Sequence, residues 1–156
     1  GDVYKRQVMR ATLEVLKSLG VDYEVKITSA HRTPEDTRNY IVDAEARGCM
    51  VFIAAAGLAA HLAGNVAAHT LRPVIGVPMD GGPLNGMDAL LSTVQMPGGV
   101  PVASVAIGKA GAKNAGYLAA QILSVADTGL ARRLVEERAR NADEVRAKDA
   151  ELQKSL

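Results

Sequence analysis

Apolar residues near the start of the chain recur at helical spacing, and the stretch that follows changes to an alternating pattern. Val8–Leu19 places its apolar side chains on one face of a helix, and Gly20 follows as a stop signal. Tyr23–Thr28 alternates apolar and polar side chains, as half-buried strands do. The sequence therefore predicts a helix and then a short strand.

The next helix has clear start signals. Thr33 can act as its N-cap, and Pro34 suits the first helical position. Glu35 and Asp36 then place two acids at the positive end of the helix dipole. We expect this helix to end near Arg47, before a glycine.

After this helix, short apolar runs that fit buried strands alternate with segments that fit helices. The expected strands are Met50–Ala54, Val74–Val77 and Val102–Ile107, and the expected helices are His61–His69, Met87–Val94 and a helical region from Ala110 to the end. This alternation through short connections predicts an α/β domain with a parallel sheet. Leu130–Leu156 is highly charged, and we expect it to lie over a surface or a neighbouring subunit.

Composition limits the core and the partners. Hydrophobic residues make up 48% of the chain, but it has one Phe, four Tyr and no Trp, so the core must be aliphatic and small. The 18 basic and 17 acidic residues leave a net charge of +1, which gives no overall field for nucleic acid or a membrane. No basic run is interleaved with aromatic residues, which also argues against nucleic-acid binding.

The single cysteine, Cys49, excludes an internal disulfide and fits a reducing compartment. The longest apolar stretches fall short of the roughly 20 residues that cross a bilayer. No signal peptide is visible in the sequence. We therefore expect a cytoplasmic protein without a membrane partner.

The chemically distinctive segments follow the expected strands. Ligands of open parallel sheets bind outside the carboxyl ends of the strands. In this chain those ends carry Ser29–Arg32, Ala55–His61, Met79–Gly86 and Gly108–Gly111. The opposite ends carry ordinary glycine stops, so the sequence predicts one site at the carboxyl edge.

Ser29–Pro34 brings a hydroxyl, an imidazole and a guanidinium to the junction of a strand and a helix. Free backbone N–H groups at a helix start favour an anion, and Arg32 offers a fork suited to phosphate. His31 is the side chain best suited to proton transfer near neutral pH. The segment can equally be a capped helix start with a solvent-exposed His–Arg pair.

Ala54–Ala60 is a run of small residues that leads to His61. Such a run lets a ligand approach the backbone closely and leaves a pocket with few side chains in it. It also suits close packing of a helix on a sheet, with His61 as a capping or core residue. Met79–Gly86 and Gln95–Pro101 are rich in Gly and Pro and can be lids or simple turns.

Other candidate sites are weaker. The three histidines, His31, His61 and His69, lack the close paired spacing of a helical zinc motif, so we expect no metal. Lys109 lies among glycines but lacks the full phosphate-loop pattern, which argues against a nucleoside triphosphate. Ala110–Leu123 carries Ala and Gly on several faces, and we expect it to pack closely against another subunit.

Five motifs occur in an order and spacing that resemble one enzyme family. They are Ser29–Pro34, Ala56–Leu62, Pro73–Pro78, Gln95–Val102 and Ala106–Gly111. From about Val8 to about Arg133 the chain closely resembles the carboxyaminoimidazole ribonucleotide mutase family, also described as the catalytic subunit of phosphoribosylaminoimidazole carboxylase. Arg32, where a lysine would indicate direct carboxylation by free carbon dioxide, resembles the bacterial mutase branch.

The resemblance implies a three-layer flavodoxin-like α/β fold, a homo-octamer, and neither a metal nor an organic cofactor. It also implies a step of purine biosynthesis that moves a carboxylate on an aminoimidazole ribonucleotide. The substrate carries this group as a carbamate on the exocyclic nitrogen, and the product, 4-carboxy-5-aminoimidazole ribonucleotide, carries it on the ring carbon. The implied route is loss of carbon dioxide, its retention in the site, and its recapture by the ring carbon.

The resemblance also assigns roles to residues. His31 matches the general acid/base of the family, which protonates the leaving nitrogen and later removes the proton of the ring carbon. The positions that match substrate-binding residues are Ser29, Ala30, Arg32, Ala56, Gly57, Ala59, His61 and Leu62. Ser29 and Arg32 match positions that hold the ribose phosphate, and His61 and Leu62 match the base pocket. The small residues would form a dry pocket that destabilises the carbamate and holds carbon dioxide close.

The N-terminal segment departs from the family. Family members begin with an apolar strand, central in the sheet, followed by a Gly-Ser-x-Ser-Asp loop that holds phosphate and ribose. Counting back from His31 without gaps places Gly1–Gln7 at this loop, with Lys5 at the aspartate position. We expect residues 8–156 to form a single mutase domain without its first strand. We expect Gly1–Gln7 to be foreign or mis-assembled sequence that lowers stability and activity.

Two other functional classes fit parts of the sequence. Without the phosphate loop, the chain can be an inactive relative that binds a nucleotide phosphate or serves only as a structural subunit of an oligomer. A flavodoxin-like binding or signalling domain fits less well. Its flavin form needs aromatic rings and its phosphoacceptor form needs an acidic cluster at the strand ends, and the sequence offers neither.

Overall fold

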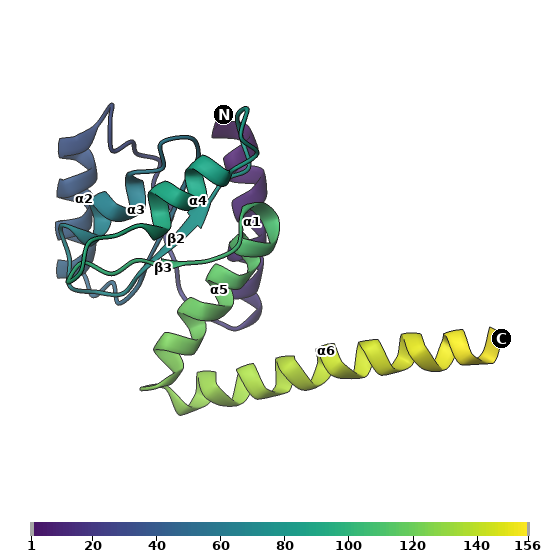
Figure 1. The fold of residues 1–156 in the computed structure, drawn as a ribbon. Helices are drawn as coiled ribbons and strands as arrows, with labels where there is room; N and C mark the ends of the chain where they lie inside the picture. The colour runs from purple at the N-terminus through teal and green to yellow at the C-terminus, as the bar shows by residue number, and fades with distance from the viewer. Residues whose placement is uncertain (1, 156) are drawn as a thin grey trace.

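A sheet of three parallel strands forms the centre of the fold, with helices around it (Figure 1). The structure is a computed structural model that describes residues 2–155. Its elements in chain order are α1 (Asp2–Ser18), α2 (Pro34–Ala46), β1 (Phe52–Ala56), α3 (Leu62–Ala67), β2 (Val74–Pro78), α4 (Met87–Val94), β3 (Ala103–Ser104), α5 (Gly108–Ser124) and α6 (Thr128–Ser155). The predicted alternation of strands and helices is therefore confirmed.

Strand β2 lies between β1 and β3, and each of its five residues is buried. The ladder of β1 and β2 runs from the Phe52–Val74 pair to the Ala56–Pro78 pair. Strand β3 adds only a short parallel ladder on the other side of β2. Because all three strands are parallel, their carboxyl ends meet at one edge of the sheet.

The two faces of the sheet bury separate clusters of aliphatic and small side chains. The cluster against α1 and α5 includes Val8, Leu16, Ile75, Val77 and Ala115, and the cluster against α2 and α3 includes Ile41, Phe52, Ala54, Ala63 and Val66. Successive residues of a strand point to opposite faces, so neighbouring residues of β2 serve both clusters. Helices on both faces confirm the three-layer α/β fold, and Phe52 is the only aromatic side chain among these two sets of buried residues.

Helix α5 uses its small residues to approach α1 of the same chain. A Cβ on Gly116 would lie 3.0 Å from both the Thr12 carbonyl oxygen and Val15 Cβ. The buried Thr12 hydroxyl donates to the Ala112 carbonyl at 2.6 Å. The expectation that this face packs against another subunit is therefore wrong, because α1 covers it.

Tyr23–Thr28 does not form the predicted strand. The segment has no regular secondary structure, and it forms no ladder with β1, which is the edge strand of the described sheet. Val25 and Ile27 are 62% and 61% exposed. An alternating pattern becomes a strand when a neighbour pairs with its backbone and a core covers one face. In the described chain this segment has neither.

The other strands are present with different bounds. Strand β1 begins two residues later than predicted, because pairing with β2 sets its position. Strand β3 is reduced to two residues, because the chain turns directly into α5. A Cβ on Gly111 would lie 1.5 Å from the Ala106 carbonyl oxygen, and Gly108 has a φ of 73°. This turn leaves no length for the longer strand that Val102–Ile107 predicted.

Two helix predictions need correction. Helix α1 begins at Asp2, so the segment before Val8 is helical from its second residue, while Gly1 lies outside the described residues. The C-terminal helical region is interrupted at Val125–Asp127. Asp127 Oδ1 accepts a hydrogen bond from the Leu130 N–H at 2.9 Å and so starts α6 as a new helix.

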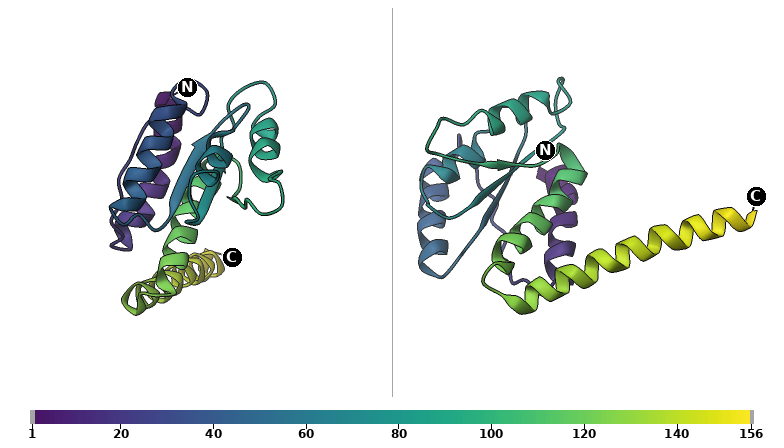
Figure 2. Two further views of the ribbon diagram at one scale, coloured as in Figure 1. Left: turned by 90° about the vertical axis from the view of Figure 1, so that its left-hand side faces the viewer. Right: turned by 60° about the horizontal axis from the view of Figure 1, so that its bottom comes forward.

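Helix α6 projects away from the rest of the domain in all three views (Figures 1 and 2). Among its described residues only Leu130 is buried. It therefore does not lie over a surface of its own chain, as one of the two expectations held, and Leu156 lies outside the described residues. Within residues 2–155, no helix combines the length and the apolar composition needed to cross a membrane.

Candidate active site

His31 lies on a turn between the extended segment and α2, and hydroxyl groups hold this turn. Thr28 Oγ1 is 3.1 Å from Thr33 Oγ1 and 2.6 Å from Oγ1 of the buried Thr37. The Ser29 N–H donates to Thr33 Oγ1, and the Thr33 N–H donates to the Ser29 carbonyl, both at 3.0 Å. The Thr33 side chain therefore closes the turn and does not cap α2, as the sequence had predicted.

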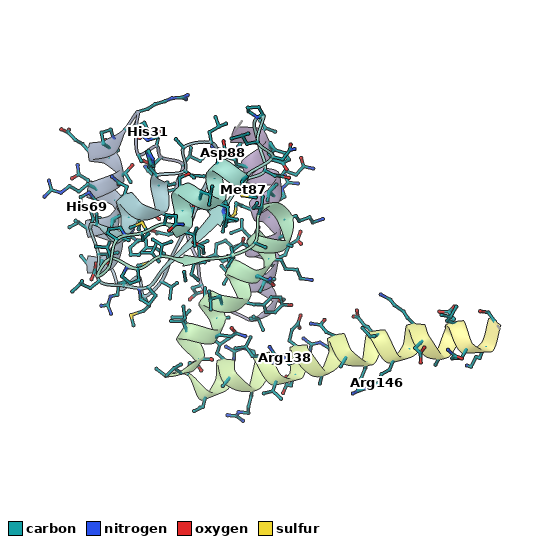
Figure 3. The ribbon with its side chains drawn as sticks, viewed as in Figure 1. His31, His69, Met87, Asp88, Arg138 and Arg146 are labelled. Atoms are coloured by element: carbon teal, nitrogen blue, oxygen red, sulfur yellow. The ribbon has the colours of Figure 1, made fainter. Side chains whose placement is uncertain are left out.

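Two imidazole rings meet at the carboxyl edge of the sheet. His31 Nε2 lies 2.7 Å from His61 Nδ1, with the ring centroids 4.8 Å apart and the ring planes at 88°. Such a hydrogen bond needs an N–H on one ring and a lone pair on the other, so one proton lies between the rings. Both residues are exposed, and Figure 3 shows His31 at the end of the domain remote from α6. The pair can therefore exchange a proton with a bound ligand.

A cavity of about 100 Å³ opens beside the two rings. Besides the histidines, its lining includes the predicted residues Ser29, Ala30, Ala56, Gly57, Ala59 and Leu62. Two motifs that are distant in the sequence therefore form one site. The alternatives of an isolated helix start and a core histidine do not describe this arrangement, because both histidines are exposed and in contact.

Arg32 is the one predicted substrate-binding residue outside the described lining of this cavity. Its side chain is exposed, and its backbone N–H donates to Ser29 Oγ at 3.2 Å. A guanidinium here can meet an anion at the solvent side of the turn. Its role as a phosphate ligand stays a prediction.

Three residues line the cavity that the sequence had not indicated as ligands, namely Lys5, Thr28 and Ala55. Thr28 and Ala55 directly precede predicted site residues, so the strand-end pattern contained their signal. Lys5 comes from the beginning of α1, and its only signal was its match to the aspartate position of the family loop. It adds a cationic residue to a lining that otherwise consists of neutral side chains and two imidazoles.

Other candidate segments lie outside the described lining. Neither Met79–Gly86 nor Gln95–Pro101 contributes to it. A Cβ on Gly108 would lie 3.3 Å from the Asp80 carboxylate, so an acid stands at the start of α5 and disfavours a phosphate there. His69 is exposed and lies away from His31 (Figure 3). Among residues 2–155, no three His, Cys, Asp or Glu side chains gather where they could hold a metal ion.

Cys49 lies on the link between α2 and β1, at the opposite edge of the sheet from the cavity. It is half-buried, and its Sγ donates to the Val51 carbonyl at 3.3 Å. Burial raises the pKa of its thiol above the usual value, so the reactive thiolate is disfavoured.

Comparison with known protein families identifies the class of this enzyme. The profile of the AIR carboxylase family matches residues 4–144, which is most of the chain. The chain belongs to this family. The resemblance that the five motifs indicated is therefore confirmed over a range that contains the whole cavity.

Several similar proteins carry the name N5-carboxyaminoimidazole ribonucleotide mutase. The protein of Bacillus subtilis (strain 168) is 58% identical over 132 residues, which cover 85% of this chain and 82% of the relative. The protein of Thermotoga maritima is 52% identical over 146 residues, with coverage of 94% and 84%. The protein of Escherichia coli (strain K12) is 50% identical over 137 residues, with coverage of 88% and 81%.

A solved structure agrees with this placement. The crystal structure of Treponema denticola PurE matches with a TM-score of 0.86 and 28% sequence identity. The match covers 95% of this chain and 91% of that chain. It therefore includes nearly all of the helices and strands, and it supports the flavodoxin-like α/β architecture.

Proposed function

We propose that this chain catalyses the carboxylate migration of N5-carboxyaminoimidazole ribonucleotide mutase in purine biosynthesis. The observation that carries the proposal is the contact of His31 with His61 beside a cavity walled by small residues. Relatives that are 50%, 52% and 58% identical bear this name. The product would be 4-carboxy-5-aminoimidazole ribonucleotide.

In this proposal His31 acts first as a general acid and then as a general base. The N–C bond of the carbamate breaks, its electron pair stays on the exocyclic nitrogen, and the protonated His31 gives that nitrogen a proton. The ring carbon then attacks the retained carbon dioxide and forms a C–C bond. His31 takes up the proton that leaves the ring carbon, so the enzyme returns to its starting protonation state.

The cavity is suited to carbon dioxide. Its volume of about 100 Å³ is well below the roughly 300–1,000 Å³ of pockets that enclose a whole drug-sized ligand. Ala56, Gly57 and Ala59 offer no charge and no nucleophile, so they disfavour the charged carbamate and do not react with carbon dioxide. The ribose phosphate would lie outside the cavity, within reach of Ser29 and the exposed Arg32.

His61 has two parts in the proposed site. With Leu62 it lines the side of the cavity where the aminoimidazole ring would lie. Its Nδ1 also orients the His31 ring through their 2.7 Å contact. A catalytic imidazole needs such a partner, because the second ring fixes which nitrogen carries the proton.

Lys5 favours a second candidate function, nucleotide binding without turnover. It lines the cavity at the position where the family loop has an aspartate. Helix α1 already includes Asp2–Gln7, so the described segment offers a helix in place of the Gly-Ser-x-Ser-Asp loop. An ammonium group can hold a phosphate or carboxylate, but it cannot accept hydrogen bonds from ribose hydroxyls. That Gly1–Gln7 is foreign sequence stays a prediction.

We further propose a cytoplasmic homo-octamer that needs neither a metal nor an organic cofactor. The reaction transfers no electrons, and the substrate itself supplies the carbon dioxide. Exposed apolar side chains on the projecting α6, such as Val135 and Val145, can be covered by neighbouring copies. The lone Cys49 fits a reducing compartment.

A spectroscopic assay of carboxylate migration tests the function. His31→Asn removes the acid/base group and should lower kcat by about 10²–10⁴-fold. His69→Asn is the matched control, because His69 is exposed and lies outside the described cavity lining. It should leave kcat unchanged.

Calorimetry with the same ribonucleotide separates the two candidate functions. Binding without migration by the unmodified chain would favour the nucleotide-binding alternative. Full activity in His31→Asn would contradict the acid/base role.

A further inference from the structure

Ser92 of α4 contacts the small-residue loop at a point outside the described cavity lining. Its Oγ accepts a hydrogen bond from the Ala60 N–H at 3.1 Å and reaches the Leu58 carbonyl oxygen at 3.3 Å. We propose that Ser92 is a positioning residue that holds the Gly57–Ala60 loop in the conformation that presents His61 to its partner ring. The inference rests on the proposed function and adds a residue to it.

Leu58 gives this loop an unusual backbone conformation. Its φ is 56°, in the left-handed region that side chains other than Gly, Asn and Asp rarely adopt. Within residues 2–155, Asn85 is the only other non-glycine residue with a positive φ. The Leu58 side chain is 54% exposed, so burial does little to offset the strain. The hydrogen bonds of the loop must therefore hold this conformation.

The Ser92 contacts bracket the strained residue. One contact is to the carbonyl of Leu58 itself, and the other is from the N–H of Ala60, two residues later. The backbone on the C-terminal side of Leu58 is thus tied at two points to one hydroxyl. Ser92 is half-buried on α4, and that helix is anchored by the buried Ala89 and Thr93. The hydroxyl therefore belongs to a firmly packed element.

Serine in a helix often bonds only to a carbonyl of the preceding turn. Ser92 also makes that contact, with the Asp88 carbonyl, and Thr93 makes its own with Ala89 at 2.7 Å. What distinguishes Ser92 is the Ala60 N–H that it accepts. Ala60 is 1% exposed, so removal of the hydroxyl would leave a buried backbone donor without this partner.

The loop passes its position directly to His61. The His61 N–H donates to the Ala59 carbonyl at 2.9 Å, and the His61 carbonyl accepts from the Asn65 N–H at 2.9 Å as α3 begins. The His61 ring then reaches His31 over 2.7 Å, and a hydrogen bond of this length is lost after a small displacement. A loop released at Ala60 would therefore weaken the contact that orients the catalytic imidazole.

The first test removes the hydroxyl and then the strain that makes it necessary. Ser92→Ala should lower kcat about ten- to a hundredfold with a smaller change in KM, because a small misplacement of a catalytic group has effects of this order. Ser92→Thr keeps the hydroxyl and should retain most of the activity. Leu58→Gly should restore most of the loss in the Ser92→Ala background, since glycine adopts a positive φ freely. Ser124→Ala is the control, because that hydroxyl donates to Gln121 within α5.

The second test does not need enzymatic activity. Hydrogen exchange of the Ala60 amide should accelerate about tenfold or more in Ser92→Ala and stay unchanged in Ser124→Ala. The ¹⁵N chemical shifts of His31 should change in Ser92→Ala as its hydrogen bond to the second ring weakens. If the unmodified chain lacks mutase activity but these changes occur, the proposed function fails while the positioning role stands. Unchanged Ala60 exchange and kcat in Ser92→Ala, or no restoration by Leu58→Gly, would overturn the inference.

Discussion

Glu24 ties the extended segment before the His31 turn to helix α2. Its carboxylate accepts hydrogen bonds from two Arg47 nitrogens at 2.9 and 2.8 Å and from the Tyr40 hydroxyl at 2.8 Å. Arg47 also donates to Asp43 at 2.7 Å. The Arg47 hydrogen bonds, followed by that of Tyr40, lower the pKa of Glu24 from 4.5 to about 2. Side chains therefore connect this segment to the fold where no strand ladder does.

Glu24→Gln should destabilise the fold in a pH-dependent way. A carboxyl group whose pKa is lower in the folded chain stabilises the fold above its unfolded pKa, and this stabilisation is lost as the pH falls through the folded pKa. The difference in unfolding free energy from the unmodified chain should be complete above about pH 5 and vanish near pH 2. Urea unfolding at several pH values measures it.

Added salt should reduce this difference, because the pair is exposed. Glu14→Gln on α1 is the control, since Glu14 is exposed and forms no ion pair within the described residues. A Glu24 effect that is the same at every pH would contradict the role of its charge.

Among the elements, β2 and the helices that cover it approach each other through a glycine. A Cβ on Gly76 would lie 2.4 Å from Thr93 Cγ2, 2.9 Å from Val102 Cγ1 and 3.2 Å from Ala63 Cβ. Thr93 is only 2% exposed, so it has no solvent into which it could move. Helices α3 and α4 therefore lie close to the sheet where β2 has no side chain.

Gly76→Ala should destabilise the fold by about 1–3 kcal/mol, because the added methyl group overpacks a buried contact. Gly98→Ala is the matched control, since a Cβ there has no neighbour within 4 Å in the described structure. It should change the free energy of unfolding by less than about 0.5 kcal/mol. Urea or thermal unfolding of both variants measures the difference. Equal effects at the two glycines would show that the contact with Thr93 is not the cause.

For the molecule as a whole, the open question is what covers α6. Val135, Val145 and Leu152 on this helix are 71%, 66% and 56% exposed. A cavity of about 520 Å³ lies at the base of the helix, lined in part by Leu118 of α5 and Leu134 of α6. Apolar side chains on a projecting helix are typical of surfaces that meet another subunit, which supports the proposed octamer.

Val145→Glu should weaken this assembly, because it places a charge on the exposed apolar side of α6. Ala147→Glu adds the same charge about 200° around the helix and is the control. Light scattering after size-exclusion chromatography measures the mass of each variant. The mass should fall for Val145→Glu, while its unfolding should be unaffected because Val145 lies outside the described core. A monomeric mass for the unmodified chain would contradict the octamer itself.

Periodicity, stop signals and motif order were sufficient for much of this protein. They predicted the alternation of strands and helices, the bounds of Met87–Val94, and a site at the carboxyl edge that joins His31 to His61. These features depend on residues that are close in sequence, or on the general rule that parallel strands end at the same edge. A helix forms its hydrogen bonds within itself, so its own sequence contains most of the information.

Only the folded chain shows which distant groups meet. Tyr23–Thr28 has the pattern of a strand but no neighbour to pair with, and the position of β1 follows from β2. The Thr33 hydroxyl binds the turn before its helix, and Ser92 binds a loop on another element. Each of these outcomes depends on a backbone group supplied by another segment, and local pattern has no information about which segment that will be.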